Sequence, residues 1–67
     1  MRPKIDLIEN QNGGFYKAFI NNHPISKAEL FDVLECEDDG FRLSYYAENF
    51  VKSHPEWELN VSEIDLR

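Results

Sequence analysis

The sequence has only one cysteine in its 67 residues, Cys36, so it cannot form an intrachain disulfide. Secreted domains of this size usually depend on disulfides, so we expect a cytoplasmic protein. Long hydrophobic runs are also missing. Asp6 interrupts the apolar stretch near the N-terminus, which excludes a signal peptide or a membrane span there. Because there is no repeat, low-complexity segment or linker, residues 1–67 are predicted to form one domain.

Basic residues are scarce as well. Seven lysines and arginines stand against thirteen aspartates and glutamates, which gives a formal net charge of −6. Nucleic-acid binders and proteins of anionic membrane surfaces obtain affinity from Lys and Arg, so the charge argues against both functions. A protein partner with a basic surface fits the charge.

The motifs of catalysis and metal binding are absent from the sequence. There is no CxxC, HxxxH or EF-hand spacing and no glycine-rich phosphate loop. Cys36 lies among acids, which should raise the pKa of its thiol and make it a poor nucleophile. His23 and His54 each precede a proline and are typical of turns or helix ends. We therefore predict a protein that is not an enzyme, with no catalytic residue, metal or cofactor.

What is present indicates a globular domain with a small core. The hydrophobic fraction is 42%, too high for a disordered chain. Apolar residues alternate with charged ones from Lys4 to Glu9, which predicts a strand. Residues 10–14, including Gly13 and Gly14, predict a hairpin turn, and Phe15 to Ile20 the return strand. Simple alternation would place Phe15, Lys17 and Phe19 on one face.

Ser26 begins the clearest local signal. Ser26 and Glu29 have the spacing of a capping box, and Ile25 and Leu30 that of the matching hydrophobic staple. The pattern predicts a helix to about Glu37, ended by Gly40 in a left-handed conformation.

Residues 41–53 support two interpretations. Alternation at Phe41, Leu43 and Tyr45 favours a strand, whereas a longer stripe of apolar residues at helical spacing favours a helix to about Ser53: Leu43, Tyr46, Ala47, Phe50 and Val51. Trp57 to Val61 then predicts a last strand, with a break near Ser62. We expect an α+β fold in which two helices pack on a three-stranded antiparallel sheet. If residues 41–45 are a strand, the alternative is a β-grasp-like ββαββ arrangement.

Acidic side chains gather in the first predicted helix and just after it. Six of them fall between Ala28 and the following glycine with no base among them: Glu29, Asp32, Glu35, Glu37, Asp38 and Asp39. Like charges at helical spacing cost about 0.2–0.5 kcal/mol per pair. The acids are therefore either solubilising charge or a surface kept acidic for a basic partner. In the second interpretation, a row of carboxylates about 4.5 Å apart along a helix imitates DNA phosphates about 3.4 Å apart.

The aromatic residues outnumber what a one-faced sheet of three short strands needs. Most are expected in the core, with some rings scattered on the surface. Phe15 and Phe19, which flank Lys17, are candidates for an interface hot spot.

In size and charge, and in no motif, the chain resembles the small acidic proteins that phages direct against host enzymes, such as DNA mimics and anti-CRISPR proteins. That resemblance implies an inhibitor or regulator that occupies a basic, nucleic-acid-binding surface of a protein partner. The alternative is an intracellular adaptor or antitoxin-like protein that binds through its aromatic sheet face or an edge strand.

Overall fold

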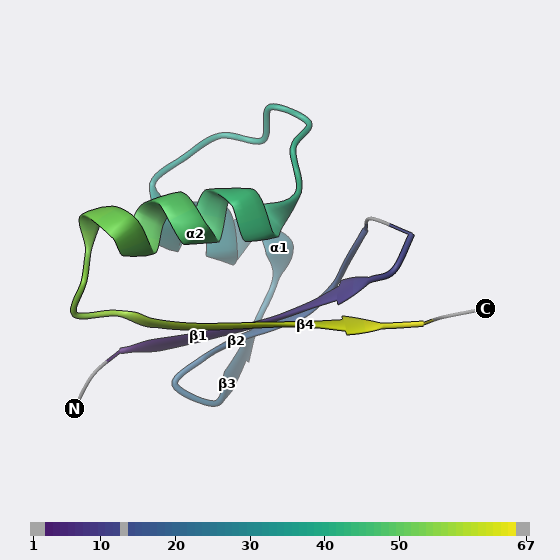
Figure 1. Ribbon diagram of the computed structural model, residues 1–67, viewed down its shortest axis with the longest axis horizontal. Helices are drawn as coiled ribbons and strands as arrows, with labels where there is room; N and C mark the ends of the chain where they lie inside the picture. Colours follow the sequence, from purple (N-terminus) through teal and green to yellow (C-terminus); the bar gives the residue numbers. More distant parts are fainter. Residues whose placement is uncertain (1–2, 13, 66–67) are drawn as a thin grey trace.

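The computed structural model describes residues 3–12 and 14–65, which form a four-stranded sheet and two helices (Figure 1). In chain order the elements are β1 (Lys4–Asn10), β2 (Phe15–Ile20), β3 (His23–Ile25), α1 (Lys27–Leu34), α2 (Leu43–Ser53) and β4 (Glu58–Ile64). Both helices lie on one face of the sheet, and the other face is left uncovered by them. The predicted α+β class is confirmed.

The sheet is mixed, with strand order β3-β2-β1-β4. β1 and β2 form the predicted hairpin, although Gly13 of its turn lies outside the described residues. β4 pairs with β1 in parallel, from Lys4 opposite Glu58 to Asn10 opposite Ile64. The expected three antiparallel strands are corrected in two respects: the last strand is parallel, and residues 23–25, for which no strand was expected, form the short strand β3. The regular β1–β4 register also replaces the break expected near Ser62.

An irregularity in the hairpin changes which aromatic side chains share a face. Ile8 pairs with Lys17 but Glu9 pairs with Phe15, so Tyr16 is the extra residue of a bulge. Phe15 therefore shares a side of the sheet with buried Glu9 and packs against the core. Phe19 pairs with Asp6 and points to the uncovered face. The expectation that Phe15 and Phe19 share one face is wrong, because the bulge inverts the alternation between them.

α1 begins as predicted and ends earlier. The Ser26 hydroxyl accepts a hydrogen bond from the Glu29 amide at 3.2 Å, and the Glu29 carboxylate accepts from the Ser26 amide at 3.1 Å. The helix ends at Leu34, where Glu35 takes the left-handed conformation with φ 55°. The Cys36 amide donates to the Phe31 carbonyl and the Glu35 amide to that of Asp32, the two bonds of a Schellman motif. Residues 35–37, predicted as the end of the helix, therefore lie outside it, and the acids 37–39 lie in a loop.

α2 confirms the helical interpretation of the second apolar stripe. Leu43, Tyr46 and Ala47 are its buried residues, and the strand alternative for residues 41–45 is not observed. The helix ends at Ser53, and Nδ1 of His54 lies 2.9 Å from the carbonyl oxygen of Phe50. His54 therefore caps the helix end, as its position before a proline suggested.

The core lies between the helices and the sheet. It consists of eight buried residues: Ile5, Leu7, Ala18, Leu30, Leu34, Leu43, Tyr46 and Ala47. Glu9 is buried with them at 2% exposure, and its Oε2 accepts a long 3.5 Å hydrogen bond from the Ser44 amide. This amide is in the first turn of α2, where Arg42 offers no side-chain cap. A carboxylate from the central strand thus caps α2, because the helix N-terminus attracts negative charge.

Candidate functional site

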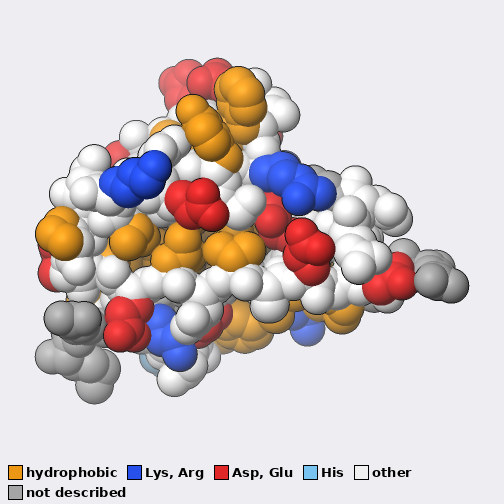
Figure 2. All heavy atoms as spheres, in the orientation of Figure 1, with side chains coloured by type: hydrophobic (Ala, Val, Ile, Leu, Met, Phe, Trp, Pro, Cys, Tyr) orange, Lys and Arg blue, Asp and Glu red, His pale blue; other side chains and the backbone are white. Residues whose placement is uncertain are grey.

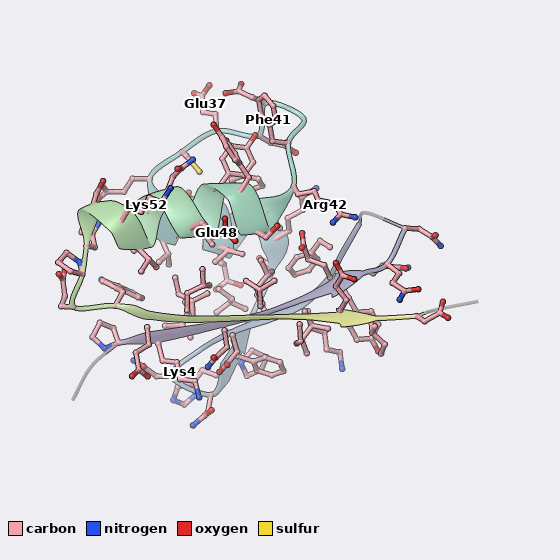
Figure 3. All side chains as sticks on the ribbon, viewed as in Figure 1. Lys4, Glu37, Phe41, Arg42, Glu48 and Lys52 are labelled. Atoms are coloured by element: carbon pink, nitrogen blue, oxygen red, sulfur yellow. The ribbon has the colours of Figure 1, made fainter. Side chains whose placement is uncertain are left out.

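The loop between α1 and α2 rises above the helices at the top of the molecule (Figure 1). Glu37, Asp38 and Asp39 are exposed on this loop. Figure 3 shows the labelled Glu37 and Phe41 in the upper part of this loop. Three of the six predicted acidic site residues are therefore consecutive on one projecting loop, which concentrates their charge.

A single hydroxyl group holds this loop against α2. The phenolic oxygen of Tyr46 accepts hydrogen bonds from the Asp39 amide at 2.7 Å and from the Phe41 amide at 3.3 Å. Tyr46 is itself buried, and its ring packs edge-on against Phe31 of α1 at a centroid distance of 5.4 Å. The acidic loop is thus anchored to the core through Tyr46.

Two further interactions shape the loop around Asp38. One carboxylate oxygen of Asp38 accepts from the Gly40 amide at 3.0 Å, and Gly40 has a φ of +88°, which glycine adopts without steric cost. The other oxygen lies 3.6 Å from Nζ of Lys27 on α1. This ion pair is half-exposed, so it stabilises the loop only weakly.

Two exposed aromatic side chains adjoin the acids. Phe41 is 61% exposed and Tyr45 is 51% exposed, and their ring centroids are 5.1 Å apart. Large apolar side chains exposed side by side are unusual on a protein this small, and such rings are typical anchors of protein interfaces. We call Glu37, Asp38, Asp39, Phe41 and Tyr45 the apex. Figure 2 shows acidic and hydrophobic side chains next to each other at the top of the molecule.

Phe41 and Tyr45 were not among the site residues predicted from the sequence. The available signal was their spacing of four residues together with their positions off the apolar stripe of α2. A ring that lies off the buried stripe of a helix must face solvent. Once the helix was preferred over the strand, this argument would have identified Tyr45.

The remaining acidic candidates lie on or at the end of α1. Glu29 is engaged in the capping box, Asp32 is exposed on the helix, and Glu35 forms the helix end. Of the six acids only Glu29 and Asp32 are within a helix, so a phosphate-like row of carboxylates along one helix is not present. Any imitation of nucleic acid would depend on the loop acids instead.

The predicted aromatic hot spot is divided between the two sides of the sheet. Phe15 packs against the core, whereas Phe19 lines an open hollow on the uncovered face. Its other lining residues are Asp6, Ile8, Asn22 and Ser62. The Asp6 carboxylate already has two partners. Its Oδ2 lies 3.7 Å from Nζ of Lys4, and its Oδ1 accepts a hydrogen bond from the side-chain amide of Asn60 at 3.3 Å.

Cys36 is half-buried at the start of the loop. Burial, and secondarily the Asp39 carboxylate, raises the pKa of its thiol. The acidic neighbourhood predicted this direction, although burial is the larger cause. A raised pKa leaves less thiolate at neutral pH and lowers the reactivity of the sulfur.

The outer side of α2 separates the apex from β4 and carries charges of both signs. Arg42, Glu48 and Lys52 are labelled there in Figure 3. Arg42 lies 3.7 Å from a carboxylate oxygen of Glu63 on β4. The acidic surface is therefore local to the apex and does not continue unbroken down this side.

Within residues 3–12 and 14–65, no group of three or more histidine, cysteine, aspartate or glutamate side chains is placed to hold a metal ion. No helix in those same ranges has the length and apolar character needed to cross a membrane. Comparison with protein-family models, with curated proteins and with solved structures found no match.

Proposed function

We propose that this protein is a non-enzymatic binding protein that docks its apex on a basic surface of a partner protein and thereby inhibits or regulates that partner. The observation that carries the proposal is that three consecutive acids on a loop anchored by Tyr46 lie beside two exposed rings, Phe41 on the loop and Tyr45 in the first turn of α2. Acids supply long-range attraction to a basic surface, and the rings supply the apolar contact that makes an encounter last.

A nucleic-acid-binding surface is the basic surface that we propose for the partner. Such surfaces carry clustered Lys and Arg that neutralise phosphates, and a compact group of carboxylates can compete for the same charges. Preorganisation supports this function, because a loop that is already anchored loses less conformational freedom on binding.

The test is affinity capture from a bacterial lysate with three forms of the full chain. The apex variant combines Glu37→Gln, Asp38→Asn and Asp39→Asn. The matched control combines Glu48→Gln, Glu56→Gln and Glu58→Gln. Like the apex variant, it removes three negative charges and changes the net charge from −6 to −3. Circular dichroism verifies that both variants are folded.

We expect the native chain and the control to retain a nucleic-acid-binding protein that the apex variant does not retain. Duplex DNA should displace that partner, and raising NaCl from about 50 to 300 mM should weaken binding at least about tenfold, because salt screens exposed charges. Equal retention by both variants, or capture that DNA and salt leave unchanged, would refute the proposal.

Phe41→Ser together with Tyr45→Ser tests the aromatic half of the apex. Both rings are more than half exposed, so the double variant should fold normally. Dissociation of the captured partner should become at least about tenfold faster, because interface aromatics act mainly on the dissociation rate. Unchanged dissociation would leave the acids alone as the binding determinant and contradict the two-part apex.

A further inference from the structure

The two outer strands of the sheet differ in how they are protected. β3 has three residues and contains Pro24, and both features block the addition of another strand. β4 has seven residues without proline or glycine, and among the described residues no strand pairs with its outer side. A long unprotected edge of this kind is a template for a further strand.

Two backbone hydrogen bonds at the ends of β4 show which of its backbone groups are available. The Glu58 amide donates to the Pro3 carbonyl, and the Ile64 carbonyl accepts from the Gln11 amide. Even-numbered residues of β4 therefore turn their backbone groups toward β1. Because these groups alternate in direction along a strand, the N–H and C=O groups of Leu59, Val61 and Glu63 point outward. They offer three donors and three acceptors at the spacing of a sheet.

The same edge offers apolar contact on its helical side. Leu59 and Val61 pair with Ile5 and Leu7, which are buried, so their side chains project toward the helices. Val61 is nevertheless 40% exposed. Figure 2 shows hydrophobic side chains at the surface between α2 and β4. A strand added beyond β4 would cover them with its alternate side chains.

Charge determines what kind of strand fits. Residues 54–65 contain four acids and no lysine or arginine. A second copy of β4 placed antiparallel would bring its own Glu58 and Glu63 alongside this acidic segment, and Arg42 is the one base in an ion pair with the described part of this strand. Like charges brought together across a sheet are destabilising, so a strand with basic side chains is favoured over a second copy.

We propose that the outer edge of β4 binds an extended, lysine- or arginine-bearing segment of a partner protein by strand addition. Backbone pairing to Leu59, Val61 and Glu63 supplies the affinity, and apolar side chains at alternate positions of the segment cover Leu59 and Val61. The apex plays no part in this contact, so either surface can be disproved without affecting the other.

The test uses the isotope-labelled full chain and a blocked peptide of about nine residues that alternates lysine and valine, long enough to pair along one strand. Amide hydrogen exchange is read residue by residue. In the free protein we expect slow exchange at Asn60 and Ser62 and fast exchange at Leu59, Val61 and Glu63. The peptide should slow exchange at these three odd-numbered positions and leave the amides of the apex unchanged.

Two variants block the edge in different ways. Val61→Pro removes an outward N–H without removing a bond to β1, and Val61→Lys sets a positive charge against the basic peptide. Val61→Thr is the matched control, because it keeps the β-branched shape and the N–H. We expect both blocking variants to bind the peptide at least about tenfold more weakly than the control. If Val61→Pro does not fold, the binding of Val61→Lys tests the proposal on its own, because a side chain that is 40% exposed tolerates a charge.

Three results would overturn the proposal. One is the absence of binding, or binding without new protection at the odd-numbered positions. Another is equal binding of a peptide that alternates glutamate and valine, which would disprove the role of charge. The third is protection of the same amides by raised protein concentration alone, which would identify a second copy as the occupant.

Discussion

Glu35 is the described non-glycine residue that ends α1 in the left-handed region, with φ 55°. This conformation costs a residue with a Cβ roughly 1–2 kcal/mol, and glycine most often occupies it at helix ends. Strained residues of this kind tend to occur where a segment must take a particular direction. Here the turn at Glu35 directs the chain out of the helix and into the loop that carries the apex.

Glu35→Gly should raise the free energy of unfolding by about 0.5–1 kcal/mol, because glycine adopts the left-handed conformation without strain. Urea denaturation measures the change. Asp32→Gly, within α1, is the control and should lower stability, because glycine weakens a helix interior. A lower stability for Glu35→Gly would mean that the carboxylate makes a stabilising interaction that outweighs the strain.

Tyr46→Phe should free the loop while leaving the core packed. The variant keeps the ring against Phe31 and removes the oxygen that accepts from the Asp39 and Phe41 amides. We expect a loss of about 1 kcal/mol in unfolding free energy and faster hydrogen exchange at these two amides. Tyr45→Phe, at a half-exposed ring, should change neither quantity. Unchanged exchange at Asp39 in Tyr46→Phe would show that other contacts fix the loop.

At the scale of elements, local signals predicted the helices better than the strands. The capping box at Ser26 and the five-residue stripe of α2 lie within single segments, so neighbouring residues are enough to specify them. The early end of α1 was missed because Glu35, a residue with no preference for left-handed geometry, takes that role instead of Gly40. β3 and the bulge at Tyr16 depend on pairing with another strand, which local patterns do not encode.

The candidate site was predictable only where it depends on neighbouring residues and not on strand pairing. Three consecutive acids, 37–39, are visible in the sequence wherever the helix ends. The hot-spot prediction for Phe15 and Phe19 assumed unbroken alternation, and one bulge separates them. The connection to β4 runs through two helices and is long enough for a parallel strand. The sequence does not by itself fix the direction in which β4 pairs with β1.

Glu9 joins two elements, because a carboxylate on β1 caps α2. Glu9→Ala should lower the unfolding free energy by about 1–3 kcal/mol, since the Ser44 amide loses a buried partner. Glu9→Gln keeps an acceptor oxygen and should cost less, about 0.5–1 kcal/mol, from the lost attraction to the helix dipole. Thermal and urea unfolding measure both. Equal losses in the two variants would indicate that the negative charge, rather than the acceptor, holds the helix start.

At the scale of the whole molecule, net charge and stability oppose each other. The chain carries a net charge of −6, and the ion pairs Lys4–Asp6, Lys27–Asp38 and Arg42–Glu63 join partly exposed side chains, so they contribute little stability. Repulsion among the excess of acids destabilises the compact state. Added salt should therefore raise the stability of the protein while lowering its affinity for the proposed basic partner.

Raising NaCl from about 20 to 300 mM should increase the midpoint of thermal unfolding by roughly 2–4 °C, the shift that about 0.5 kcal/mol produces in a domain of this size. The apex variant with residues 37–39 neutralised is the comparison and should show a smaller increase. A midpoint that falls with salt would mean that the ion pairs outweigh the repulsion.

The parallel pairing of β4 with β1 has a consequence for how the protein is made. Because Lys4 pairs with Glu58, β1 cannot complete its pairing with β4 until residues 58–64 have been synthesised. On the ribosome, the hairpin and both helices emerge first, with one side of β1 open and Ile5 and Leu7 incompletely covered. Closing such a long loop is slow, and the waiting intermediate exposes surface that chaperones recognise. Substitutions that delay docking of β4 should therefore reduce the yield of folded protein in cells by more than their effect on equilibrium stability.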